Sequence, residues 1–81
     1  MQEQHYEYQV WILGYNEDYS VNDWEQLEGR FEEREKAEWF ALHYDFCKPV
    51  GTPRAEVVVE EVLIAENGDE ECLGVLLESE L

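Results

Sequence analysis

The chain has 81 residues, of which 21 are Asp or Glu and only 5 are Lys or Arg, so its formal net charge is −16 at pH 7. Nucleic acid and anionic membrane surfaces would repel such a chain, which excludes direct binding to either. Acidic disordered chains are poor in aromatic residues, whereas this one has three Trp, five Tyr and three Phe. We therefore expect a single folded domain, residues 1–81, with the charge on its surface.

The first expected element is a strand over His5–Tyr15, with the sequence HYEYQVWILGY. Val10 and Ile12 fall on one side at period two, and Trp11 and Leu13 fall on the other. Apolar residues on both sides indicate a central strand. The following segment, NEDYSVND, is rich in turn-forming residues and predicts a loop.

The segment Asp23–Phe31 fits either a strand or the start of a helix. Its large apolar residues have the i, i+3, i+7 spacing of a helix, but the continuation of that stripe is charged. Gly29 lies near this change of phase, where it costs a helix about 1 kcal/mol relative to Ala. We expect a short second strand ending near Arg30 and a helix over about Glu32–Phe46. One long helix from Asp23 is the alternative.

The expected helix has two apolar stripes on roughly opposite sides. One consists of Ala37, Phe40, Ala41 and Tyr44, and the other of Trp39, Leu42 and Phe46. A surface helix needs only one such stripe to pack on its own domain. The second stripe is covered either by loops of the same chain or by another molecule, and for the latter a homodimer is the first hypothesis.

The segment Arg54–Ala65 is dense in β-branched residues and predicts a third strand, and Glu70–Glu78 predicts a fourth. Asn67-Gly68 between them predicts a two-residue type I′ turn. This pairing would place Val62 and Leu77 on one face of the sheet and Cys72 on the other. We predict an α+β fold: a small antiparallel sheet of three or four strands with one helix packed on a face, in the order β-β-α-β-β. If residues 23–31 are helical, the order is β-α-β-β.

Motifs for catalysis are weak. His43 and Cys47 are four residues apart on the expected helix, but a stable zinc site usually needs three or four ligands. The carboxylate clusters do not have the spacing of a calcium-binding loop, and no nucleophile or phosphate-binding motif is present. We predict no enzymatic activity, no metal and no cofactor.

Two cysteines are too few for a disulfide framework, so Cys47 and Cys72 are expected to be reduced. The N-terminal sequence MQEQHYEYQV lacks the basic and apolar regions of a signal peptide, and no apolar run reaches the length of a membrane span. We expect a soluble protein of the cytoplasm.

The acidic surface is the remaining candidate for function. Carboxylates spaced like DNA phosphates would offer a basic DNA-binding groove a substitute polyanion, and interleaved aromatic side chains would anchor the contact. The predicted partner-binding residues are Glu17, Asp18, Asp23, Glu25, Glu28, Glu32, Glu35, Glu38, Trp39, Glu66, Asp69, Glu70 and Glu71.

In size, charge and aromatic content the whole chain resembles the small acidic phage proteins that act as DNA-mimic inhibitors of restriction enzymes, uracil-DNA glycosylase, nucleoid proteins or CRISPR effectors. The segment Phe31–Ala41 is also similar to a strand-to-helix pattern of many short phage and bacterial proteins. The resemblance implies an anti-CRISPR-like or anti-restriction inhibitor in the host cytoplasm, with a basic nucleic-acid-binding protein as partner. The alternative is a homo-oligomeric, non-enzymatic adaptor that binds a protein partner through its apolar faces.

Overall fold

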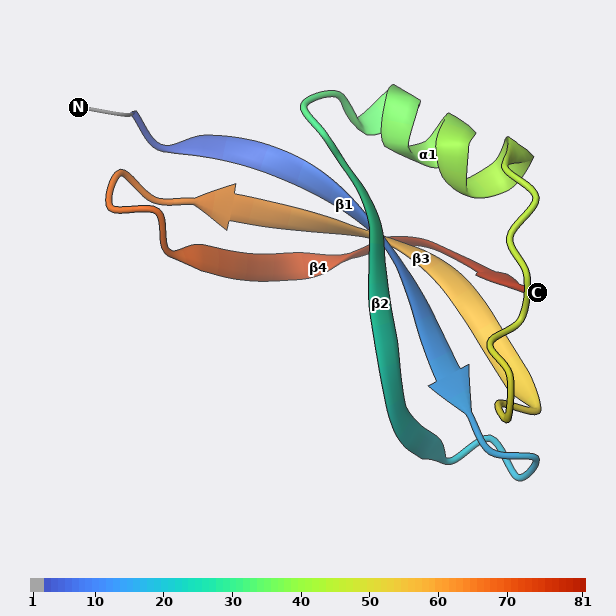
Figure 1. Ribbon diagram of the computed structural model, residues 1–81. Helices are drawn as coiled ribbons and strands as arrows, with labels where there is room; N and C mark the ends of the chain where they lie inside the picture. The colour runs from blue at the N-terminus through green and yellow to red at the C-terminus, as the bar shows by residue number, and fades with distance from the viewer. Residues whose placement is uncertain (1–2) are drawn as a thin grey trace.

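The computed structural model, which describes residues 3–81, contains four strands and one helix (Figure 1). The elements are β1 (His5–Tyr15), β2 (Val21–Phe31), α1 (Arg34–His43), β3 (Arg54–Ile64) and β4 (Glu70–Glu80). Neighbouring strands are antiparallel, and their order across the sheet is β2-β1-β3-β4. The predicted α+β class and the order β-β-α-β-β are confirmed, and the β-α-β-β alternative is wrong.

The segment that fitted either a strand or a helix belongs to β2. One extra residue, Glu28, lies between Leu27 and Gly29 in the pairing with β1 and forms a β-bulge. A bulge shifts the alternation of side chains by one position, so Trp24 and Phe31 both pack against the core on the helix side although they are seven residues apart. The spacing that suggested a helix therefore results from a bulged strand.

The helix is shorter than the expected Glu32–Phe46, because the backbone becomes extended at Tyr44. Phe46 was expected on the outer stripe of the helix, and this is wrong. It lies beyond the helix and packs against Phe40, with 5.4 Å between the ring centroids. Because the helix ends at His43, the following segment can turn back and place Phe46 at the edge of the core.

The main core lies between α1 and one face of the sheet. Small and β-branched residues form it: Val10, Ile12, Ala37, Ala41, Ala55, Val57 and Val59. On α1, Ala37 and Ala41 are the buried residues, and their small side chains allow the helix to lie close to the strands.

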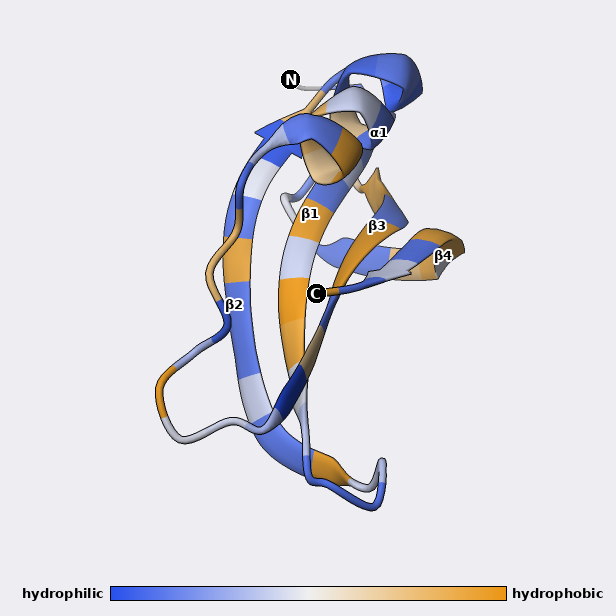
Figure 2. Cartoon of the chain, turned by 90° about the vertical axis from the view of Figure 1, so that its right-hand side faces the viewer, coloured by the Kyte–Doolittle hydropathy of each residue, from blue (hydrophilic) through white to orange (hydrophobic). Residues whose placement is uncertain are grey.

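The opposite face of the sheet is buried in its central part, although no helix of the described residues covers it. Val58 and Val62 on this face are only 2% and 3% exposed. The strands fan out strongly, and the β3–β4 hairpin curls away from the plane of β1 and β2 (Figures 1 and 2). On this face the twist brings Arg30 of β2 within 3.1 Å of Glu70 of β4. Val58 and Val62 are therefore covered within one chain.

The register of β4 corrects two predicted positions. Cys72 is paired with Val62, because the loop before β4 has three residues instead of the predicted two. Leu77 is paired with Val59, because the register then shifts twice along the strand. Cys72 and Leu77 therefore lie on the faces opposite to those predicted, and Leu77 joins the core on the helix side.

The turn between β3 and β4 is not of type I′. Only Gly68 has a positive φ, of 92°, whereas that turn needs a positive φ at Asn67 as well. The Gly68 amide donates to the carbonyl oxygen of Ala65 at 2.9 Å, and the Ala65 amide donates to that of Asp69 at 2.8 Å. These bonds define a three-residue loop in which the glycine supplies the left-handed residue.

Candidate functional site

The few cationic side chains are bound within the chain. Arg30 pairs with Glu7 and Glu70, and the other pairs are Arg34–Glu38, Lys36–Glu33 and Arg54–Glu80. The fifth cation, Lys48, donates to the backbone carbonyl of Pro53. These contacts involve five carboxylates. Within residues 3–81, the other sixteen have no ion-pair partner.

The predicted partner-binding residues do not form one compact patch. Glu17 and Asp18 lie in the β1–β2 loop and Asp23 and Glu25 at the adjoining end of β2. The group Glu66, Asp69, Glu70 and Glu71 lies at the β3–β4 hairpin. The register pairs Tyr15 with Arg54 and His5 with Ile64, so these two groups lie at opposite ends of the sheet (Figure 1).

A third group of predicted residues lies on or beside the helix. Glu28 forms the bulge of β2, Glu32 follows that strand, and Glu35, Glu38 and Trp39 belong to α1. Glu38 is paired with Arg34 and is therefore less available than predicted. The acidic residues extend along the molecule, whose principal extents are 45 × 24 × 18 Å.

The face of the sheet without the helix carries carboxylates that the sequence argument missed. The register places Glu56 opposite Glu80, and Glu78 opposite Val58. Glu60 lies on the same face by alternation. We call Glu56, Glu60, Glu78 and Glu80 the acidic row. Like charges directly opposite one another destabilise a sheet, and only Arg54, near Glu80 at 3.5 Å, offsets this pair.

Next to the acidic row lies a hollow of about 270 Å³, lined by Tyr15, Tyr19, Arg54, Ala55, Glu56 and Glu80. A hydrogen bond to the Glu56 carboxylate, together with burial and the charges of Glu56 and Glu78, raises the pKa of Tyr15 to about 12. The Arg54 guanidinium lies 4.1 Å from the ring centroid of Tyr19 and donates from Nε to the carbonyl oxygen of Glu17 at 3.1 Å. Arg54 thus fastens the β1–β2 loop to the start of β3.

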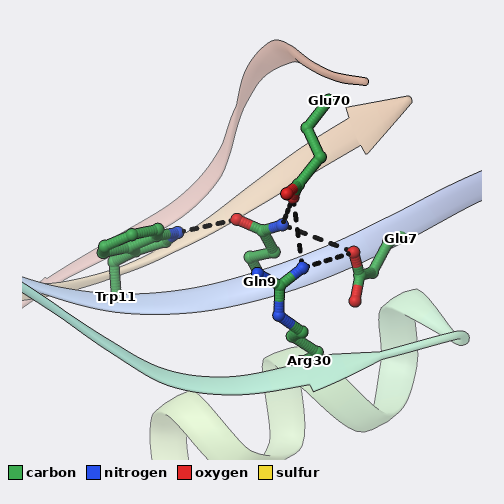
Figure 3. Close-up of polar contacts among 5 residues, drawn as sticks. All are labelled: Glu7, Gln9, Trp11, Arg30 and Glu70. Carbon is green, nitrogen blue, oxygen red and sulfur yellow. Dashed lines mark hydrogen bonds and ion pairs between the residues drawn. The ribbon is translucent and has the colours of Figure 1, made fainter. Parts of the chain in front are cut away.

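A polar bridge crosses the same face at its other end (Figure 3). Gln9 is 4% exposed, and its Nε2 donates to Glu70 at 2.6 Å while its Oε1 accepts from Trp11 Nε1 at 3.0 Å. Arg30 donates to both Glu7 and Glu70, at 3.0 and 3.1 Å. Hydrogen bonds from Gln9 and Arg30 lower the pKa of Glu70. Glu70, predicted to bind a partner, is therefore occupied within the fold.

The outer surface of α1 is apolar at its centre. Trp39 is 63% exposed and Leu42 56% exposed. The Trp39 ring stacks on His43, with 4.6 Å between centroids and 11° between planes. This contact engages one of the two candidate metal ligands, while Cys47 lies beyond the helix and is exposed.

Residues 3–81 hold neither a metal-binding cluster nor a membrane-spanning helix. No group of three or more His, Cys, Asp or Glu side chains comes together there in a way that would hold a metal ion. No helix of that range has the length and apolar character needed to cross a membrane.

Comparison with protein-family models, with curated proteins and with solved structures gives no match for this chain.

Proposed function

We propose that this protein inhibits a basic nucleic-acid-binding protein, such as a bacterial defence protein, by occupying its nucleic-acid site as a phage-encoded DNA mimic. The observation that carries the proposal is the density of negative charge along the molecule. A net charge of −16 over a length of 45 Å gives one negative charge per about 2.8 Å. B-DNA carries one per about 1.7 Å, and one strand of it one per about 3.4 Å.

The ion pairs made by the Lys and Arg side chains support the same proposal. Because four of the five are paired with carboxylates, few cationic groups remain to repel a basic groove. The unpaired carboxylates lie at both hairpins, beside the helix and on the acidic row, so a groove could follow them along the long axis. A partner that makes several Lys or Arg contacts gains affinity that salt screens.

The test begins with capture of proteins from a bacterial extract on the immobilised 81-residue protein, followed by purification of each captured protein. Direct titration is then made at 50 and 300 mM salt, with and without a 30-base-pair DNA duplex. The proposal expects affinity to fall at least tenfold at the higher salt, and the duplex to compete. A captured protein whose binding is indifferent to both salt and duplex contradicts the proposal.

The exposed Trp39 and Leu42 favour a second candidate, the homo-oligomeric adaptor that binds through apolar faces. Self-association would bring together two surfaces of the same negative sign, and the repulsion is strongest at low salt. The adaptor therefore predicts oligomers that become more stable as salt rises, the reverse of the inhibitor's response. Sedimentation equilibrium at micromolar concentrations and two salt concentrations separates the two candidates.

A further inference from the structure

The outer surface of α1 is the strongest remaining feature of the molecule. Ala37 and Ala41 face the core, and Trp39 is two residues from each, which is about 200° around the helix axis. The indole therefore projects on the side directly away from the core, and Leu42 extends the apolar surface by one turn. Neither residue is needed to close the main core, whose cluster includes other helix residues instead.

Trp39 is held in position although it is exposed. Its ring stacks on that of His43, and His43 Nδ1 lies 2.9 Å from the Trp39 carbonyl oxygen. An aromatic side chain that is already ordered loses little rotamer freedom on binding, which is a property of residues that dominate interface energies.

The charges around this surface select the kind of partner. Arg34 and Lys36, the two cations of the helix, are paired with Glu38 and Glu33. Glu35 and Lys36 both lie one turn before Trp39, and among residues 3–81 Glu35 has no ion-pair partner, whereas the charge of Lys36 is offset by Glu33. The rim of the apolar surface is therefore anionic, and a second copy of the chain would present the same sign. A cationic partner complements both the rim and the rest of the molecule.

We propose that the outer face of α1, formed by Glu35, Trp39, Leu42 and His43, docks onto a cationic protein surface with Trp39 seated in an apolar depression rimmed by Lys or Arg. This inference rests on the proposed function and adds a specific anchor to it. The anchor supplies short-range affinity that salt does not screen, whereas the distributed carboxylates supply long-range attraction.

Two synthetic helical peptides of equal positive charge test the proposal. One combines Lys with Leu on one face, and the other replaces every Leu by Gln. Binding is measured by calorimetry, and the indole N–H resonance of Trp39 is followed by NMR. We expect the Leu-containing peptide to bind at least tenfold more tightly and to shift that resonance. Equal binding of the two peptides would overturn the proposal.

Matched variants locate the contact. Trp39→Ala should remove the advantage of the Leu-containing peptide and change binding of the Gln-containing peptide less than twofold. Val75→Ala, at a comparably exposed apolar position on β4, is the control and should leave the advantage in place. An advantage that survives Trp39→Ala overturns the proposal. Far-UV circular dichroism verifies that the helix is retained, as expected because Ala favours a helix.

Three further outcomes are decisive. A dimer that forms in sedimentation equilibrium and is lost in Trp39→Ala would assign this face to a second copy and overturn the cationic partner. If the peptide binds at Trp39 but no captured protein is displaced by DNA, the docking face on α1 stands and the proposed inhibitor is rejected. If a captured protein is displaced by DNA but binds the Trp39→Ala variant with unchanged affinity, the proposed inhibitor stands and this docking face is rejected.

Discussion

Arg30 on β2 donates to Glu70 on β4 at 3.1 Å, although β1 and β3 lie between these two strands in the sheet. In a flat sheet, side chains three strands apart could not meet, because neighbouring strands are about 4.8 Å apart. The contact is therefore a direct consequence of the strong twist. Gln9 occupies the centre of this polar bridge.

Removing Gln9 should destabilise the fold more than removing the ion pair that it accompanies. Gln9→Ala leaves the partly buried Trp11 indole N–H without its partner and removes a buried side chain, which together cost about 1–3 kcal/mol of unfolding free energy. Arg30 is half exposed, so Arg30→Ala should cost less than about 1 kcal/mol. Urea unfolding measures both changes, with Lys36→Ala as an exposed control close to zero. A larger loss for Arg30→Ala than for Gln9→Ala would contradict this account of the bridge.

The strands were predictable from local patterns, and the contacts between them were not. Alternation over His5–Tyr15 and β-branched residues from Arg54 identified β1 and β3 because each pattern is contained in one segment. The bulge at Glu28 was hidden, since one inserted residue turns a period of two into a spacing that looks helical.

The same limit applies to the candidate site. Glu56 and Glu80 are 24 positions apart, and they face one another only because of the β3–β4 register, which two irregularities in β4 shift. The polar bridge depends additionally on the twist of the whole sheet. By contrast, the position of Trp39 opposite the buried alanines follows from helical periodicity, which the sequence contains.

Tyr15 should ionise at higher pH than an ordinary tyrosine. Its pKa is raised from 10.0 to about 12, chiefly by the hydrogen bond to Glu56. Because the folded pKa lies above the unfolded one, its contribution to stability is complete below about pH 10 and is lost as the pH rises toward 12. Ultraviolet titration of tyrosinate should show one late group that disappears in Tyr15→Phe.

Glu56→Gln keeps a similar side-chain size but removes the charge, so it should lower the pKa of Tyr15. Glu25→Gln, on β2, serves as the control because Glu25 is not among the groups that shift this pKa. A late tyrosinate that persists unchanged in Glu56→Gln would show that its cause is not the contact with Glu56.

Tyr19 carries backbone strain that its contact with Arg54 offsets. Its φ is 68°, and the β1–β2 loop has the same bond pattern as the β3–β4 turn, where Gly68 takes the left-handed position. Relief of this strain by Tyr19→Gly is worth about 1 kcal/mol, while loss of the cation–π contact costs about 0.5–1 kcal/mol. The substitution should therefore be nearly neutral in the native chain.

A double-mutant cycle separates the two effects on Tyr19. With Arg54→Ala already present, Tyr19→Gly should raise the unfolding free energy by about 0.5–1 kcal/mol more than it does alone. Thermal and urea unfolding both measure this coupling. A coupling of zero would mean that the ring and the guanidinium lie together without interacting energetically.

Charge removal from unpaired carboxylates should weaken partner binding more than removal from paired ones. Glu17→Gln combined with Glu66→Gln takes one unpaired carboxylate from each hairpin, at opposite ends of the molecule. Glu33→Gln combined with Glu38→Gln removes the same total charge, but from groups that already contact Lys36 and Arg34. The two variants therefore have equal net charge, and any difference between them reflects where the charge lies.

For a partner that follows the long axis, the hairpin variant should lose several-fold more affinity than the helix variant at 50 mM salt. The difference should shrink at 300 mM, since the Debye length falls from about 14 Å to about 6 Å. If the two variants lose affinity equally, net charge alone controls binding, and the arrangement of carboxylates along the sheet has no part in recognition. If only the helix variant loses affinity, the partner contacts α1 and its flank rather than the length of the molecule.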